Sequence, residues 1–323
     1  MVKFVIGENE AGQRVDRFLR KYFAGVPLSR IYRIIRKDLK VNGRRVREDA
    51  MLSEGDELTL YISQEQFENN ARPVRKKPPA RKQFRVIYED PQVLIVSKPR
   101  GLLVHGDKTE KSNTLQNQVC AYLQERGEYD PARERTFTPS PANRIDRNTT
   151  GLVIFGKTAA AVRELTGAIR ARDGIRKFYL AIACGQIREE MTLTSRLQKD
   201  EVKNQVTVTE DDDGLLSETR VRPICVGDRF TLVEAELITG RTHQIRVHLA
   251  KAGHPLAGDP KYGKGRQKGA GSTGQMLHAY RLQFGELGQP LEELSGRTIQ
   301  AEPPKTFAQA CRELVGCDVP GSK

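Results

Sequence analysis

Residues 143–151 read Asn-Arg-Ile-Asp-Arg-Asn-Thr-Thr-Gly and place one carboxylate, Asp146, between Arg144 and Arg147. The apolar run at 152–155 is typical of a buried strand, so the polar turn before it holds Asp146 on a rigid scaffold. Cationic neighbours favour the ionised acid, and guanidinium groups also bind phosphate. The stretch therefore indicates chemistry on a nucleic acid, although an Arg-x-Asp-Arg loop taken alone is more often a surface salt bridge.

Four further blocks accompany this stretch. They read Val-Ser-Lys-Pro-Arg-Gly-Leu-Leu-Val-His at 96–105, Lys-Phe-Tyr-Leu-Ala at 177–181, Thr-Gly-Arg-Thr-His-Gln-Ile-Arg-Val-His at 239–248 and Gly-His-Pro-Leu-Ala-Gly-Asp-Pro-Lys-Tyr-Gly at 253–263. In this order, the five blocks resemble the signature segments of the RluA-type pseudouridine synthases, and the resemblance covers about residues 85–300. The family commonly has His where this chain has Asn143, a difference that bears on the target site and leaves the catalytic assignment intact.

The resemblance implies an enzyme that isomerises uridine to pseudouridine in structured RNA, with large-subunit ribosomal RNA as the expected target. The reaction breaks the N1–C1′ bond, turns the base and joins C5 to C1′ without a redox change, so no cofactor is required. By resemblance, Asp146 is the catalytic nucleophile or base, and Arg246 is the buried cation that keeps it ionised. Tyr179 would stack on the uracil or assist removal of the C5 proton. Acylal, Michael-adduct and glycal routes all remain open.

The RNA must also be held with its target base out of the stack. The resemblance assigns this task to Arg144, and Arg241 is predicted to contact RNA as well. A salt bridge is the alternative role for Arg144.

A metal site is not expected. His243 and His248 lie five residues apart near His254, whereas helical zinc pairs are spaced i, i+4, and no third ligand is supported. Asp259 is predicted to belong to a turn, with the orientation of a loop arginine as the alternative.

Composition agrees with a polyanionic partner. The 323 residues carry a formal net charge of +13, with a sequence pI near 9.6. The five cysteines are scattered, which predicts neither a disulfide framework nor a zinc site. The N-terminus lacks a signal-peptide pattern, and no apolar run approaches the ~18 residues of a membrane span. We therefore expect a cytoplasmic monomer that binds structured RNA and no membrane.

Residues 1–62 are predicted to form a small RNA-binding domain. Apolar residues from Val15 to Phe23 recur at helical spacing, and Ser29 is expected to cap a second helix. Positions 14–47 contain twelve Lys or Arg residues and two acidic residues. The arrangement resembles the S4 RNA-binding fold. The predicted phosphate-binding residues are Arg30, Arg33, Lys37, Lys40 and Arg44.

The remainder is divided into a basic linker at 63–84, a catalytic domain at 85–310 and a frayed tail at 311–323. In the catalytic domain, strands are expected in runs rather than in strict alternation with helices. This pattern predicts an α+β fold with a mixed, largely antiparallel sheet, joined to a small N-terminal α/β S4-like domain. Helices are expected near residues 115–126, 159–172 and 242–252.

Two other functions compete with the isomerase. The basic module alone would suffice for a non-catalytic RNA-binding or ribosome-assembly protein, but it would not explain Asp146, Tyr179 and Arg246 together. A nucleoside glycosylase or hydrolase would also use an ionised aspartate. Such enzymes typically need two carboxylates, and no second acid is an obvious partner for Asp146 in the matched blocks.

Overall fold

Two separate β-sheets organise the chain. The computed structural model describes residues 1–23, 25–70, 81–172, 174–200, 205–209, 211–212, 214–263 and 274–320. The smaller sheet is antiparallel, has the strand order β1-β3-β2 and belongs to an N-terminal module with its own apolar core. The elements of this module are β1 (Val2–Val5), η1 (Glu8–Glu10), α1 (Val15–Tyr22), α2 (Leu28–Asp38), β2 (Leu39–Val41), β3 (Glu57–Leu60) and α3 (Gln64–Asn70).

The module differs from its prediction at two points. Helix α2 begins at Leu28 with Pro27 as its N-cap, so the prediction that Ser29 caps this helix is wrong. The fixed backbone of proline starts the helix instead. Helix α3 lies where a linker was expected, because Phe67 is buried against the rings of Phe4 and Tyr22. The predicted linker is therefore wrong at 64–70, and its residues 71–80 lie outside the described part.

The larger sheet has the strand order β10-β9-β11-β12-β8-β13-β7-β5-β4, with β14 paired to β13 and β6 paired to β7. Strands β13 and β7 run parallel, whereas the other neighbours along this path are antiparallel. The predicted mixed, largely antiparallel sheet is confirmed. The strands are β4 (Arg85–Glu89), β5 (Val93–Lys98), β6 (Ser140–Pro141), β7 (Thr150–Gly156), β8 (Ile175–Cys184), β9 (Met191–Asp200), β10 (Gln205–Thr209), β11 (Leu215–Val226), β12 (Phe230–Leu237), β13 (Leu277–Phe284) and β14 (Thr298–Gln300).

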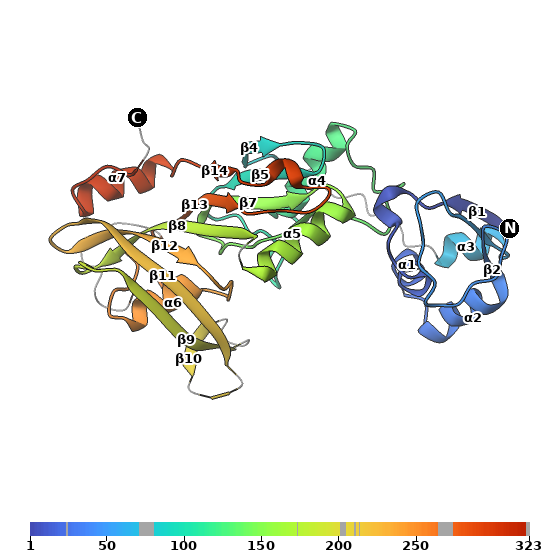
Figure 1. The fold of residues 1–323 in the computed structure, drawn as a ribbon, viewed down its shortest axis with the longest axis horizontal. Coiled ribbons are helices and arrows are strands. Elements are labelled where there is room, and N and C mark those ends of the chain that lie inside the picture. The colour runs from blue at the N-terminus through green and yellow to red at the C-terminus, as the bar shows by residue number, and fades with distance from the viewer. Residues whose placement is uncertain are drawn as a thin grey trace.

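Helices cover both faces of this sheet (Figure 1). One face packs against α4 and α6, and its core includes Tyr179. The opposite face packs against α5 and α7, and Leu180 points into its core beside α7. Neighbouring strand residues thus belong to different cores, as the two-residue period of a strand requires. The helices are α4 (Leu115–Glu125), α5 (Ala159–Ala171), α6 (Gln244–Lys251), η2 (Glu292–Leu294) and α7 (Lys305–Leu314).

The three helices predicted in this region are confirmed as α4, α5 and α6. The side chains of Thr114 and Thr158 cap α4 and α5 by accepting hydrogen bonds from the backbone N–H groups of Asn117 and Ala161. Strands β9 and β13 were not predicted. In the part of the chain that the structure describes, no helix has the length and apolarity needed to cross a membrane.

The predicted frayed tail is wrong as far as residue 320. Helix α7 extends to Leu314, with Cys311 fully buried, and Val315 and Val319 are also buried beside it. These side chains pack on Leu180 and neighbouring residues of the sheet. The tail is short and partly polar. Its buried residues Val315 and Val319 are too few to form a periodic apolar pattern that would predict burial.

Val319→Ala tests this correction. Removing two buried methyl groups should lower the free energy of unfolding by about 1.5–3 kcal/mol, because transfer and cavity costs add. Urea denaturation of both proteins measures the change. The matched control is Asp318→Ala, whose exposed ion pair with Arg312 should matter little. Equal stability of the two variants would mean that the tail is not part of the core.

Candidate active site

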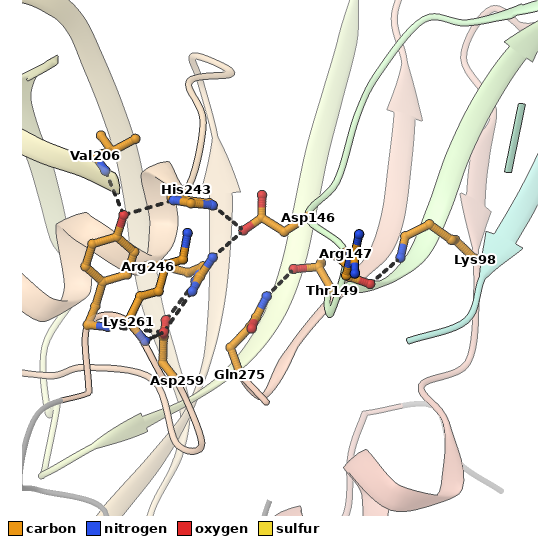
Figure 2. Close-up of polar contacts among 11 residues, drawn as sticks. Lys98, Asp146, Arg147, Thr149, Val206, His243, Arg246, Asp259, Lys261 and Gln275 are labelled. Carbon is orange, nitrogen blue, oxygen red and sulfur yellow. Dashed lines mark hydrogen bonds and ion pairs between the residues drawn. The ribbon is translucent and has the colours of Figure 1, made fainter. Parts of the chain in front are cut away.

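The loop that carries Asp146 joins β6 to β7 and is held by hydrogen bonds to β7, within itself and to Gln275. Asn143 Oδ1 accepts a 2.8 Å hydrogen bond from the Ile154 N–H, so the residue that replaces the family's His anchors the loop to β7. The Thr149 N–H donates to the carbonyl of Asp146 at 3.1 Å and closes a turn. Gln275 Nε2 donates to Thr149 Oγ1 at 3.3 Å (Figure 2). These bonds fix where the backbone of Asp146 lies.

Lys98 supports the same loop from beneath. Its buried Nζ donates to the carbonyl oxygens of Pro99, Leu102 and Arg147 at 2.8–2.9 Å, which matches the three N–H groups of an ammonium. Burial lowers the pKa of Lys98 to about 7, while the charge of Asp146 acts in the opposite direction. Figure 2 shows Lys98 reaching the backbone of Arg147, next to Asp146. Lys98 therefore anchors the backbone next to the carboxylate.

Gly151 allows β7 to approach β13. Its φ is +110°, and a Cβ atom there would lie 2.0 Å from the carbonyl oxygen of Ala279. Only glycine fits at such a distance. The parallel pairing of β7 with β13 thus depends on the glycine that ends the 143–151 stretch.

The cation beside Asp146 is Arg246, on the first turn of α6. Its Nη1 donates to Asp146 Oδ2 at 2.8 Å, while its Nε and Nη2 bind both carboxylate oxygens of Asp259 at 2.7 and 2.8 Å (Figure 2). The side chain of Arg246 is 4% exposed and that of Asp259 is 0% exposed, whereas Asp146 remains 22% exposed. Asp259 therefore holds the guanidinium, and the guanidinium holds one oxygen of Asp146.

Arg246, Asp259 and Asp146 form a largely buried triad whose charges stabilise one another. Burial alone would lower the pKa of Arg246, but hydrogen bonds and charges from Asp259 and Asp146 outweigh it and raise that pKa. Burial would likewise raise the pKa of Asp259. The guanidinium and the backbone N–H groups of Lys261 and Tyr262 instead hold it below its usual value. The arginine is thus permanently charged in a dry place.

The arginine that contacts Asp146 is not one of its two sequence neighbours. Arg147 pairs with Asp107 at 3.5 Å, and Arg144 is an exposed residue. Arg144 and the equally exposed Arg241 lie at the rim of the cavity that contains Asp146. The positive charge in contact with Asp146 comes from a residue 100 positions away.

Tyr179 lines the same cavity from β8. It is 4% exposed and packs among Ile145, Leu277 and other apolar residues of the core. Burial, with a further contribution from the charge of Asp146, raises the pKa of Tyr179, so its phenol is neutral at physiological pH. Sequence reasoning named Asp146, Tyr179 and Arg246, and the structure brings all three to one cavity.

Other polar residues of the site were missed or named only for turn chemistry. Asp259 orients an arginine, as the alternative prediction had it, but this arginine is Arg246 on helix α6 rather than a loop residue. Sequence reasoning did not name Lys98 or Tyr262 as site residues. Their positions in two of the matched blocks were the signal that could have identified them. His243 lies with its Nε2 3.9 Å from Asp146 Oδ2, and its Nδ1 is 2.9 Å from the hydroxyl of Tyr262.

The histidines do not converge on a metal. His248 contacts the hydroxyls of Ser195, Ser217 and Thr219, while His254 contacts the carbonyl of Cys184. Among the described residues, no three acidic, histidine or cysteine side chains form a group that could hold a metal ion.

A larger cavity, of about 810 Å³, lies on the opposite face beneath α7. Residues such as Arg100, Thr150 and Lys305 line it, and it contains none of Asp146, Tyr179 and Arg246. The small cavity at Asp146 is the better candidate, because a partly exposed carboxylate, a buried cation and an aromatic ring meet there. Of the described residues that line it, Asp146 is the one acid.

The chain resembles known proteins along most of its length. Residues 92–251 match the family model described as RNA pseudouridylate synthase. "Ribosomal large subunit pseudouridine synthase C" of Vibrio parahaemolyticus is 36% identical over 294 residues, 88% of each chain. The Escherichia coli protein of the same name is 34% identical over 318 residues, 94% of this chain and 93% of its own.

Solved structures support the fold. Human RNA Pseudouridylate Synthase Domain Containing 4 is 20% identical and matches with a TM-score of 0.56, over 71% of this chain and 92% of its own. Human RNA Pseudouridylate Synthase Domain Containing 1 is 21% identical, with a TM-score of 0.52 over 73% and 97%.

Asp259→Asn tests the importance of the buried triad. The variant keeps the side-chain shape but weakens the hold on a buried cation, so unfolding free energy should fall by about 3–5 kcal/mol. The pKa of Asp259 is lowered from 3.8, so the difference from wild type should be complete above about pH 4. It should shrink as pH falls through the folded value. Urea denaturation from pH 3 to 8 measures this.

The control is Asp212→Asn, at an exposed surface pair with Arg196, which should leave stability unchanged. A pH-independent difference between wild type and Asp259→Asn would contradict the electrostatic explanation.

Proposed function

The chain belongs to the RNA pseudouridylate synthase family, and we propose that it isomerises uridines of large-subunit ribosomal RNA with Asp146 as the reacting carboxylate. One observation carries the assignment of Asp146. A buried arginine, itself clamped by Asp259, holds one oxygen of Asp146 in a cavity that remains open to a ligand. A guanidinium in this position supplies a counter-charge to a carboxylate that is partly removed from water.

This geometry suits each of the three possible routes. With Oδ2 bound to Arg246, the other oxygen of Asp146 is directed to attack carbon or to take a proton from C2′. The clamp formed by Asp259 prevents the guanidinium from following the carboxylate as it reacts. The same arrangement disfavours a glycosidase. Asp259, the acid that lies nearby, is fully occupied with Arg246 and cannot act as a second catalytic carboxylate.

Tyr179 supplies an apolar wall rather than a strong base. Its raised pKa means that removing its proton at neutral pH is costly, whereas its ring already lines the cavity. We infer that the ring packs on the uracil and that the hydroxyl acts while protonated.

Base flipping requires cations at the rim. Arg144 and Arg241 are exposed there and flank Asp146 from two different loops. We propose that they bind the phosphates beside the flipped nucleotide and hold it in place.

The N-terminal module is proposed to anchor the RNA. Its exposed residues Arg30, Arg33 and Lys37 follow one another along one side of α2, and Lys40 and Arg44 continue this charge onto the adjoining hairpin. We call these five residues the α2 basic face. The exposed ring of Tyr61 lies 5.4 Å from Lys40 Nζ and adds a stacking surface. We also propose that the enzyme acts in the cytoplasm as a monomer.

Asp146→Asn should abolish conversion and leave binding almost unchanged. The amide has the same shape but is a poor nucleophile and base, so the single-turnover rate should fall by roughly 10³-fold or more. Pseudouridine mapping of ribosomal RNA from cells lacking the protein, then supplied with wild type, Asp146→Asn or Asp212→Asn, identifies the target. Restoration of the modification by Asp146→Asn would show that the chemistry lies elsewhere.

Neutralising part of the α2 basic face should weaken RNA binding and its dependence on salt. Two lost phosphate contacts should reduce the slope of log K against log salt by roughly 1–2 units. The variant is Arg30→Ala with Arg33→Ala, measured by titration of structured ribosomal RNA across a salt series. The matched control, Lys305→Ala with Arg312→Ala, removes two cations from α7, which packs on the large sheet and is not part of the N-terminal module. Equal slopes for the two double variants would exclude the α2 basic face as the anchor.

A further inference from the structure

A nitrogen atom of His243 faces the cavity beside Asp146. The side chain of His243 is 9% exposed, and its Nε2 lies 3.9 Å from Asp146 Oδ2. That distance is too long for a hydrogen bond. Among the residues that the structure describes, none makes a hydrogen bond to this Nε2, and His243 lines the cavity together with Tyr179. A nearly buried polar atom thus faces Asp146 at the cavity (Figure 2).

The other ring nitrogen shows which atom carries the proton. The backbone N–H of Val206 donates to the hydroxyl oxygen of Tyr262 at 3.0 Å, and this hydroxyl lies 2.9 Å from His243 Nδ1. Burial raises the pKa of Tyr262, so the hydroxyl keeps its own hydrogen. Because its oxygen already accepts from Val206, the arrangement favours donation of this hydrogen to Nδ1. In a neutral ring the hydrogen then resides on Nε2. The nearby carboxylate of Asp146 favours the same tautomer.

The imidazole is also uncharged. Burial lowers the pKa of His243 to about 4, although the charge of Asp146 acts in the opposite direction. The Arg246 guanidinium lies 5.1 Å from the centre of the Tyr262 ring and helps to hold that ring in place. The site therefore presents a fixed, neutral N–H group that does not compete with Arg246 for Asp146.

The reaction needs such a donor. Cleavage of the N1–C1′ bond leaves its electron pair on the uracil, where the negative charge spreads to a carbonyl oxygen. Addition of a carboxylate to the ring also places charge on a carbonyl oxygen. A fixed N–H donor aimed at developing negative charge lowers the barrier, and a neutral imidazole can fill this role. The need is common to the acylal, Michael-adduct and glycal routes.

We propose that His243 is a further catalytic residue, whose Nε2–H donates a hydrogen bond to a carbonyl oxygen of the flipped uracil as negative charge develops there. The proton stays on His243, and no bond to the histidine forms or breaks. Tyr262 is the positioning residue that selects the tautomer. This inference rests on the proposed function and adds a residue to it.

Two substitutions separate a chemical role from a structural one. His243 adopts a left-handed backbone with φ of 55°, which Asn tolerates better than Gln. The amide of Gln reaches the position of Nε2 and can donate there, whereas the shorter Asn cannot. A structural role predicts that His243→Asn is the better enzyme. The proposal predicts the reverse: His243→Asn should lose roughly 10²–10³-fold in single-turnover rate at saturating enzyme, and His243→Gln should recover part of this loss.

Thio-substituted RNA supplies the second measurement. Wild type and His243→Asn are given RNA with uridine, 2-thiouridine or 4-thiouridine at the target, because sulfur accepts hydrogen bonds poorly. One thio substrate should slow wild type markedly and slow His243→Asn little further, since the lost bond is already absent. Tyr262→Phe should reduce the rate on uridine by about tenfold, with RNA affinity unchanged.

The outcomes are distinct. Better activity of His243→Asn than of His243→Gln, or losses from substitution and sulfur that multiply, would overturn the catalytic role of His243 and leave the proposed function intact. If the His243 variants changed RNA affinity and not the single-turnover rate, the catalytic role of His243 would likewise be overturned. If wild type itself made no pseudouridine in any target RNA, the proposed function would fall and this inference with it.

Discussion

A single guanidinium, that of Arg246, lies between two carboxylates, and the site depends on this shared contact. Burying an arginine beside one acid alone would leave part of its fork without acceptors. Asp259 accepts two of its hydrogen bonds and is itself held by backbone N–H groups of the 253–263 segment. A third N–H donor, on Nη1, is thereby directed at Asp146 Oδ2, and the other oxygen of Asp146 stays outside this contact.

The two sides of the site come from different parts of the sheet. Asp146 enters from the loop before β7, and Arg246 enters from α6, which follows β12 in sequence. Strand β13 lies between β7 and β8 and brings these parts together. Gly151 permits the close pairing of β7 with β13, and Lys98 secures the adjoining loop. A displacement at Gly151 or Lys98 would move the carboxylate of Asp146 relative to the guanidinium of Arg246. The packing of the sheet therefore sets how these two groups face each other.

The proposed RNA anchor and the proposed reacting carboxylate lie in separate parts of the molecule. The N-terminal module, with the α2 basic face, lies at one end of the molecule, whereas Asp146 is positioned by the large sheet (Figure 1). The N-terminal module contacts the catalytic part through Asn9 of η1. This side chain accepts a hydrogen bond from the N–H of Ala159 at the start of α5 and donates one to Glu134. This division suits an enzyme that must recognise an extended RNA and still react with one base. In the proposed function, phosphate contacts position the RNA, and the cavity at Asp146 selects the base.

The amino-acid order was sufficient to indicate the family, the mixed sheet and the residues Asp146, Tyr179 and Arg246, because five blocks of local sequence carry these features together. The confirmed helices were also predictable, since helical periodicity and threonine caps are local properties. Contacts between distant residues were not, apart from the pair of Asp146 and Arg246, which the resemblance implied. The role of Asp259 in clamping Arg246, the anchoring by Lys98 and the tautomer of His243 each depend on side chains that meet only after the sheet has formed. The C-terminal valines and Phe67 looked like parts of a tail and a linker, because burial of an isolated apolar residue leaves no period to detect. Local patterns therefore identified which chemistry was present, and tertiary packing decided which atoms face one another.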